Sequence, residues 1–109
     1  ERVAAYRELE VTALAANDPQ RAAEFVADTL GPLAREDAAA ARLRETLRIY
    51  LEEAGNAPRT AARLYTHRNT ILKRIARTTE LLGYEPVGDR RLAVEVALEL
   101  RRRLAAPRG

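Results

Sequence analysis

Polar and basic side chains are concentrated between His67 and Arg77 in a pattern suited to contacts with nucleic acid. Arginine can donate in a fork to the O6 and N7 atoms of guanine, and asparagine can pair with the N6 and N7 atoms of adenine. Lysine and threonine suit contacts with phosphate oxygens. The segment offers all four residue types, in Arg68, Asn69, Thr70, Lys73, Arg74 and Arg77.

Catalytic and metal-binding chemistry has few candidate residues in this chain. Cysteine is absent, which excludes disulfides, thiolate metal sites and a cysteine nucleophile. His67 is the only histidine, too few for a His-rich zinc centre. The acidic pairs Glu36–Asp37 and Glu52–Glu53 have no accompanying nucleophile, and the sequence has no Gly-rich phosphate loop. We therefore expect neither an enzyme nor a cofactor or metal site.

The charge is distributed unevenly along the sequence. Residues 1–53 carry seven Arg and eleven acidic residues, and residues 80–109 carry six Arg and five acidic residues. Residues 54–79 hold six cations and no acid, namely Arg59, Arg63, Arg68, Lys73, Arg74 and Arg77. Such a stretch favours a polyanionic partner. The plainer alternative is a solvated cationic face that pairs with the acidic N-terminal half of the chain.

The composition predicts an all-α fold. The chain has 109 residues, of which 47% are hydrophobic, and this suffices for one core. Ala, Leu, Arg and Glu dominate and favour helices, whereas no alternating, strand-like run occurs. Apolar runs are far shorter than the ~20 residues of a membrane span, so no membrane contact is expected. The absence of Met and the start at Glu1 lead us to expect a fragment of a longer protein.

Gly, Pro and capping residues divide the sequence into about six expected helices, over residues 3–16, 19–30, 38–54, 57–64, 67–82 and 90–104. The residues placed to cap helix N-termini are Asp18, Asp37, Asn56, Thr66 and Asp89, and those placed to end helices are Gly31, Gly55 and Gly83. Apolar faces at helical spacing are expected to be buried. They comprise Val3, Tyr6, Leu9 and Ala13, then Ala22, Phe25, Val26, Thr29 and Leu30, then Leu43, Leu47, Tyr50, Leu51 and Ala54, and finally Leu92, Val96, Leu100 and Leu104.

The fourth and fifth expected helices form a candidate helix-turn-helix with a break at Tyr65–Thr66. A DNA-reading pair of this kind needs a turn of about 3–4 residues and a close crossing, which Ala61 and Ala62 permit. At about 100° per residue, one largely apolar face of the second helix is expected to point inward and comprises Ile71, Ile75, Thr78 and Leu82. Leu64, ahead of the turn, is expected to pack with this face. The opposite face is polar and comprises Asn69, Thr70, Lys73 and Arg77, with Arg68 and Arg74 at its edges.

These positions suggest a division of roles. We assign base reading to Arg68, Asn69 and Lys73. At the start of the short helix, where unpaired amides suit an anion, we assign phosphate contact to Asn56, Arg59 and Thr60. The remaining polar positions are also assigned to phosphate contact or positioning, namely His67, Thr70, Arg74 and Arg77. His67 is expected to lock the turn by a hydrogen bond. The tyrosines Tyr6, Tyr50, Tyr65 and Tyr84 are expected in the core or at its boundary, and Arg101, Arg102 and Arg103 on a solvated face.

The same residues also carry a family resemblance over about residues 30–104. The motifs are Thr46-Leu47, Tyr50-Leu51, Gly55-Asn56, His67-Arg68-Asn69-Thr70, Leu82-Gly83 and Asp89-Arg90-Arg91-Leu92. Together they resemble the C-terminal DNA-binding domain of the purine-catabolism regulator (PucR) and sugar-diacid regulator (CdaR) family. The two-helix layout is also similar to that of the factor for inversion stimulation (Fis). Lys73 and Ile75 depart from the more common aromatic–Arg–Leu pattern of the family.

This resemblance implies the DNA-binding domain of a bacterial, cytoplasmic transcription regulator. Residues 1–34 are then an N-terminal helical segment leading from an absent sensory region, and residues 35–109 are the helix-turn-helix domain. The implied partners are double-stranded DNA, a second copy in a homodimer, and a small-molecule effector bound outside this fragment. The alternative is a helical dimerisation or protein-interaction module that does not bind DNA.

Overall fold

Five α-helices and one short 3-10 helix make up the part of the chain that the computed structural model describes, which is residue 13 and residues 16–104. In order these are α2 (Pro19–Leu30), η1 (Gly31–Ala34), α3 (Ala38–Glu52), α4 (Ala57–Arg63), α5 (Arg68–Leu82) and α6 (Arg91–Leu104). No strand occurs in that part. The all-α prediction is confirmed. The helix expected over residues 3–16 lies largely outside the described residues.

Short-range capping sets three helix N-termini at the residues that the sequence predicts. The carboxylate of Asp18 accepts a hydrogen bond from the Arg21 amide at 3.1 Å, and that of Asp37 from the Ala40 amide at 2.8 Å. The Asn56 side chain accepts from the amide of Arg59 at 2.9 Å. Each cap satisfies an amide that the helix itself leaves unpaired.

Some helix ends differ from the prediction because the backbone leaves the helix elsewhere. α3 ends at Glu52, and the chain turns through Ala54 and Gly55, both with positive φ. Gly31 has a positive φ, but Pro32 continues into η1 instead of ending helical structure, because proline suits a first turn. α6 begins at Arg91, one residue later than expected.

The main core lies between α2, η1, α3 and α6. Its buried side chains are Ala22, Val26, Leu30, Leu33, Leu47, Leu51, Val94, Ala97, Leu98 and Leu100. This core contains residues from both sides of the boundary expected at residue 34: α2 and η1 before it, and α3 and α6 after it. The described residues on the two sides pack against each other.

Five expected core positions are exposed, one of which is Ala13, ahead of α2. Leu92 and Leu104 on α6 are 55% and 36% exposed, and Phe25 on α2 is 37% exposed. The α6 prediction was correct for Val96 and Leu100 and wrong for its two ends. A row of residues four apart drifts about 40° around a helix at each step, so the ends of the row leave the buried face. Ala54 is also exposed, since it lies beyond the end of α3.

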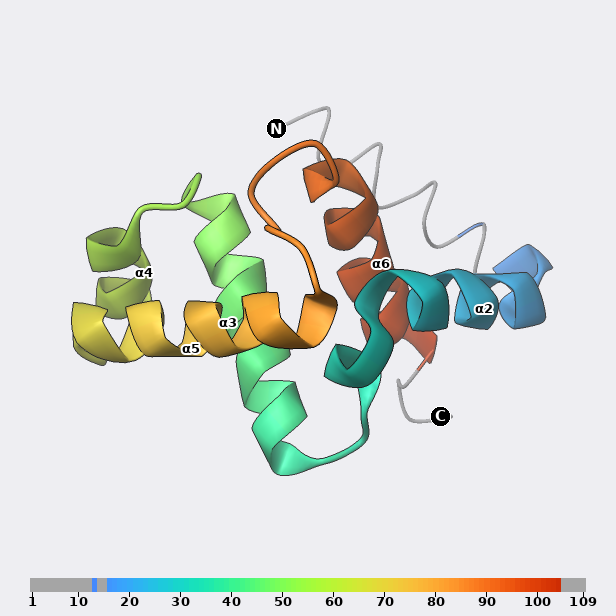
Figure 1. The fold of residues 1–109 in the computed structure, drawn as a ribbon. Coiled ribbons are helices and arrows are strands. Elements are labelled where there is room, and N and C mark those ends of the chain that lie inside the picture. The colour runs from blue at the N-terminus through green and yellow to red at the C-terminus, as the bar shows by residue number, and fades with distance from the viewer. Residues whose placement is uncertain (1–12, 14–15, 105–109) are drawn as a thin grey trace.

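A second, smaller core holds the helix-turn-helix together. Ala57 and Ala61 of α4 pack on Ile71 of α5, with Tyr50 and Ile75 partly buried against them. Ile75 also packs against the main core, so it joins the two clusters. α4 and the first turns of α5 consequently lie at one end of the molecule, and α2 lies at the other (Figure 1).

Several arginines bind backbone carbonyl groups instead of facing solvent. Arg44 Nη1 donates to the carbonyl oxygens of Leu33 and Arg35, at 2.8 and 2.7 Å. Arg101 Nε donates to the carbonyl oxygen of Ala34 at 3.0 Å, so the expectation that Arg101 lies on a solvated face was wrong. Burial, followed by repulsion from Arg101, lowers the pKa of Arg44.

Two buried threonines give a matched test of this packing. The hydroxyl of Thr78 has no hydrogen-bond partner in the described part, whereas that of Thr46 donates to the carbonyl oxygen of Arg42 at 2.9 Å. We expect Thr78→Val to raise the free energy of unfolding by ~1 kcal/mol, because it removes an unpaired buried hydroxyl. Thr46→Val should lower it by ~1–2 kcal/mol, because it removes this hydrogen bond and also the one that the hydroxyl accepts from Arg74 at 3.3 Å. Urea denaturation followed by circular dichroism measures both, and equal losses in the two variants would contradict the assignment.

Candidate nucleic-acid interface

A tight turn joins α4 to α5 and sets the position of the second helix. The Leu64 amide donates to the carbonyl oxygen of Thr60, and the Thr66 amide to that of Ala61, both at 3.0 Å. Tyr65 between them has a φ of 55°, the left-handed region. A bulky residue in that region costs ~1 kcal/mol or more, so the packing of the two helices must hold it there. The predicted helix-turn-helix arrangement is confirmed.

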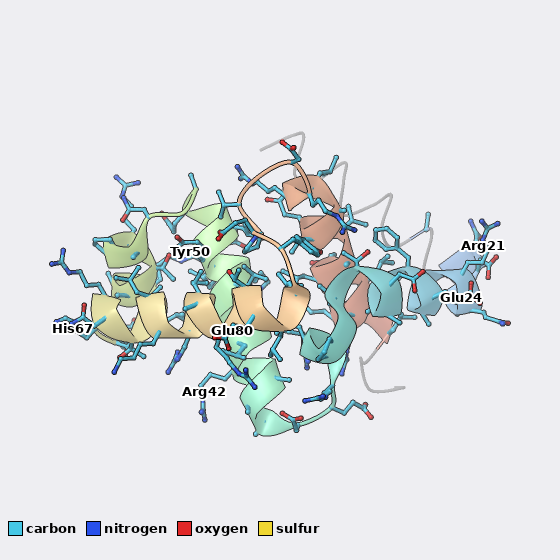
Figure 2. The ribbon with its side chains drawn as sticks, in the orientation of Figure 1. Arg21, Glu24, Arg42, Tyr50, His67 and Glu80 are labelled. Atoms are coloured by element: carbon cyan, nitrogen blue, oxygen red, sulfur yellow. The ribbon has the colours of Figure 1, made fainter. Side chains whose placement is uncertain are left out.

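His67, and not Thr66, caps α5. Its backbone is extended, with φ −89° and ψ 147°, and its Nδ1 accepts a hydrogen bond from the Asn69 amide at 3.0 Å. Because Nδ1 accepts, the proton of the neutral ring resides on Nε2. His67 is exposed at the end of the molecule opposite α2 (Figure 2), so Nε2–H can donate to a partner outside the protein.

The polar side of α5 is open to solvent. Ile71 and Thr78 are fully buried, which orients the helix. Arg68, Asn69 and Lys73 are exposed, and neither Arg68 nor Lys73 has an ion pair among the described residues. All three side chains that the sequence suggests for base reading are therefore accessible to solvent.

The residues assigned to phosphate contact are not all available. Thr60 is fully buried and its hydroxyl donates to the carbonyl oxygen of Asn56 at 2.8 Å, so that assignment was wrong. Arg74 is half-buried and donates to the hydroxyl of Thr46 at 3.3 Å, which braces α5 against α3. Thr70 is half-buried. Of the residues assigned to phosphate contact, the exposed ones are Asn56, Arg59, His67 and Arg77.

Carboxylates of α3 and its C-cap neutralise one part of the basic stretch. Arg63 Nη1 lies 2.9 Å from Glu52 and 3.1 Å from Glu53. Hydrogen bonds with Glu52 and then Glu53 raise the pKa of Arg63. Arg59 is held more loosely, 3.9 Å from Glu53 with its side chain 75% exposed. The alternative, that the basic stretch pairs with the acidic N-terminal half, is thus correct for Arg59 and Arg63 of α4. At the start of α5, Arg68 is exposed to solvent.

Comparison with known proteins agrees with this geometry. The family model of the PucR C-terminal helix-turn-helix domain matches residues 43–100, more than half of the chain. The chain belongs to this family. It is therefore a helix-turn-helix domain of the PucR C-terminal type, and we refer to it below as the PucR-type domain.

Two curated proteins are similar to the PucR-type domain. One is the "Purine catabolism regulatory protein" of Bacillus subtilis (strain 168), 37% identical over 78 residues, which are 72% of this chain and 14% of that protein. The other is the "Uncharacterized protein in pkwA 5'region" of Thermomonospora curvata, 46% identical over 56 residues, which are 51% of this chain and 31% of that protein. The chain thus matches less than a third of either relative. No solved structure matches it.

Two exposed side chains of the PucR-type domain were not among the expected site residues. Tyr65, expected in the core or at its boundary, is 95% exposed at the turn, where its backbone is in the left-handed region. Leu72 is 50% exposed on α5, next to the fully buried Ile71. Helical periodicity does not separate Leu72 from the buried side, since at about 100° per residue it lies about 100° from Ile71 but only about 60° from Ile75. Nothing in the sequence signals the conformation of Tyr65.

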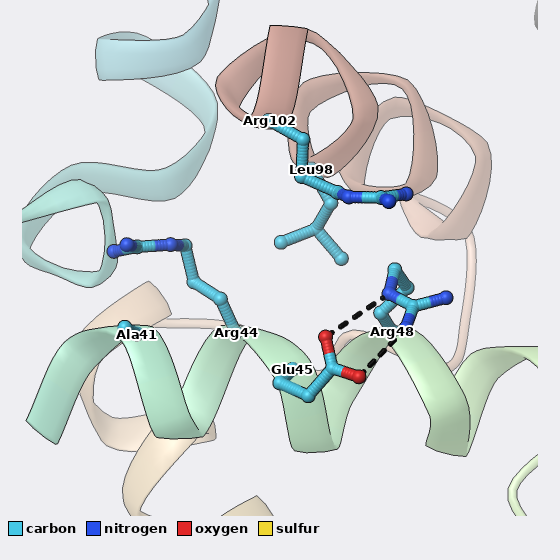
Figure 3. Close-up of a pocket in the computed structure, with 6 residues that line it drawn as sticks. All are labelled: Ala41, Arg44, Glu45, Arg48, Leu98 and Arg102. Atoms are coloured by element: carbon cyan, nitrogen blue, oxygen red, sulfur yellow. Dashed lines mark hydrogen bonds and ion pairs between the residues drawn. The ribbon is translucent and has the colours of Figure 1, made fainter. Parts of the chain in front are cut away.

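A second group of arginines lies between α3 and α6 around a pocket of about 170 Å³ (Figure 3). Arg48 is held by Glu45 at 2.6 Å and Glu52 at 3.0 Å, and Arg102 lies 3.1 Å from Glu99. Partial burial opposes the charge of Arg48, but the two carboxylates outweigh it and raise the pKa of Arg48. Arg44 points away from Arg48 toward η1 (Figure 3). Because the fold compensates these cations, the pocket offers little to an anion.

The described residues contain no group of His, Cys, Asp and Glu residues that could hold a metal ion. Among them, no helix combines the length and apolarity required to cross a bilayer.

The cap on α5 gives a direct test of the turn. His67→Ala should lower the free energy of unfolding by ~1 kcal/mol, because the Asn69 amide loses its acceptor. His67→Asn should retain most of the stability, since asparagine is a good N-cap residue. Urea denaturation of the three proteins measures this. Equal stability of His67→Ala and the unaltered chain would show that the hydrogen bond contributes nothing.

Proposed function

We propose that this PucR-type domain binds double-stranded DNA in a sequence-specific manner, with the first turns of α5 in the major groove. The observation that carries the proposal is the open polar side of α5, where Arg68, Asn69 and Lys73 are exposed on the first turns of the helix. An α-helix fits the major groove of B-DNA, and the bases present distinct donor and acceptor patterns there.

In this proposal, three side chains of α5 read bases. Arg68 forks onto a guanine, Asn69 pairs with an adenine, and Lys73 donates to an acceptor one helical turn further along. Asn69 and Lys73 are four residues apart and so lie about 6 Å apart along the helix axis. Since base pairs stack about 3.4 Å apart, the two can reach bases one to two steps apart.

Phosphate contacts would orient the domain on the duplex. Arg59 and Asn56 at the start of α4, His67 through Nε2–H, and Arg77 are the exposed candidates. Arg77 has an ion pair with Glu80 at 2.9 Å, but both side chains are more than half exposed, so the pair is weak and a phosphate can compete for it. Thr70 and Arg74, both half-buried, are second-rank candidates, and for Arg74 a contact requires release from Thr46.

In this proposal, parts of a longer regulator outside this domain provide the effector site and hold two copies together. We propose that an effector binds outside these residues, and that two copies read half-sites about 34 Å apart, one turn of DNA. The sequence in the groove, and not the effector, is what this domain recognises.

Base-reading residues are tested by alanine variants on a duplex selected from a random pool. Arg68→Ala and Asn69→Ala should each weaken binding by ~1–3 kcal/mol and relax specificity at one base pair. Fluorescence anisotropy at fixed salt measures the affinities. Arg21→Ala is the matched control, because Arg21 is an exposed arginine at the opposite end of the molecule from His67 (Figure 2). Unchanged binding by both α5 variants would refute the assignment of the reading helix.

Arg59 should behave differently from Arg68. As a phosphate contact, its replacement by alanine should weaken selected and unselected duplexes equally. It should also make the slope of log K against log salt less steep by ~0.9, the value for one phosphate contact.

Glu53 offers a test of the competition between carboxylate and phosphate. Glu53→Gln should raise DNA affinity about two- to fivefold at low salt, because it releases Arg59 and part of Arg63 and removes a negative charge near the duplex. Glu24→Gln makes the same charge change at the far end of the molecule (Figure 2) and should leave affinity unchanged. Equal gains in both variants would mean that only net charge matters.

The protein-interaction alternative makes an opposite prediction for the unaltered chain. A module without DNA binding would show no anisotropy change with bulk genomic DNA at low salt. The open cations of α5 favour DNA binding over that alternative.

A further inference from the structure

We infer that Leu72 is a specificity-determining residue that contacts the C5-methyl group of a thymine next to the adenine read by Asn69. This inference rests on the proposed function, because it requires α5 in the major groove. It adds an apolar contact to a site that is otherwise described by polar and charged side chains.

The first observation is the exposure of Leu72. On α5, Ile71 is fully buried and Ile75, Leu81 and Leu82 are partly buried, whereas Leu72 is 50% exposed. It is the one large apolar side chain that α5 leaves open. A single exposed leucine is ordinary on a protein surface, so exposure alone does not assign a role. Its position on α5 does.

Leu72 lies on the part of α5 that carries the base-reading residues. It follows Asn69 by three residues, and side chains three apart on a helix have Cβ atoms about 5–6 Å from each other. Helical side chains tilt toward the N-terminus, so the Leu72 methyl groups lie over the turn that holds Arg68 and Asn69. Ala76, four residues further on, is also exposed and is too small to shield Leu72.

The chemistry of the major groove supplies the partner. Among the base edges there, the thymine C5-methyl is the apolar group, and apolar side chains contact it in specific complexes. Asn69 suits adenine. Adjacent Asn69 and Leu72 therefore match an A·T-containing step, in which one residue hydrogen-bonds the adenine and the other packs on a thymine methyl.

Deoxyuridine substitution isolates this contact. Uracil keeps every hydrogen-bonding group of thymine and lacks only the methyl, so each thymine of the selected duplex is replaced in turn. With the unaltered chain we expect uracil at one position to weaken binding about three- to fivefold, the equivalent of one buried CH₃. This position adjoins the adenine at which Asn69→Ala loses its specificity. Leu72→Ala should bind the thymine and uracil duplexes equally. Leu92→Ala, which alters another exposed leucine on α6, should retain the thymine preference.

The outcomes separate the inference from the proposed function. If the unaltered chain binds no duplex, the proposed function fails and the inference with it. If it binds but no uracil position weakens binding, or if Leu72→Ala retains the full thymine preference, the inference alone is overturned. Circular dichroism of Leu72→Ala checks that the fold is kept, which the exposure of the side chain leads us to expect. Leu72→Met, which retains an apolar contact, should restore part of the preference.

Discussion

The burial of one narrow side of α5 is the constraint on which the rest of the structure depends. Ile71 and Thr78 are fully buried, and Ile75 lies between the small core of the helix-turn-helix and the main core. A helix of 15 residues gains little stability on its own in water, so packing must hold it. Fixing one side of α5 fixes the opposite side as well, and this is how an apolar contact determines which polar groups face outward.

The turn before α5 shows what this packing has to overcome. Tyr65 adopts a left-handed backbone conformation that disfavours a bulky side chain, and its ring gains no burial in return. The contact of Ala57 and Ala61 with Ile71 offsets that cost. Small residues on α4 let the two helices approach closely, and the strained turn lets them do so over few residues. The same geometry places His67 where its ring can cap α5 and still present Nε2–H outward.

Arginine serves three different purposes in this molecule. Arg44 and Arg101 bind carbonyl oxygens around η1 and so contribute to the fold. Arg63 is neutralised by Glu52 and Glu53, and Arg68 remains open. Net charge alone would treat these residues as equal. The difference is that a guanidinium already bound to a carboxylate must exchange one partner for another to reach a phosphate, whereas an open one exchanges only water.

The sequence by itself determined the fold class, most helix boundaries and the position of the helix-turn-helix. Caps such as Asp18, Asp37 and Asn56 were predictable because each acceptor and its amide lie three residues apart. Tertiary structure alone decided which expected site residues are available. The burial of Thr60 and the bond between Arg74 and Thr46, 28 positions apart, depend on how α3, α4 and α5 pack, and so does the exposure of Tyr65. Helical periodicity orients a side chain around its own axis, but only the neighbouring helices decide which directions are covered.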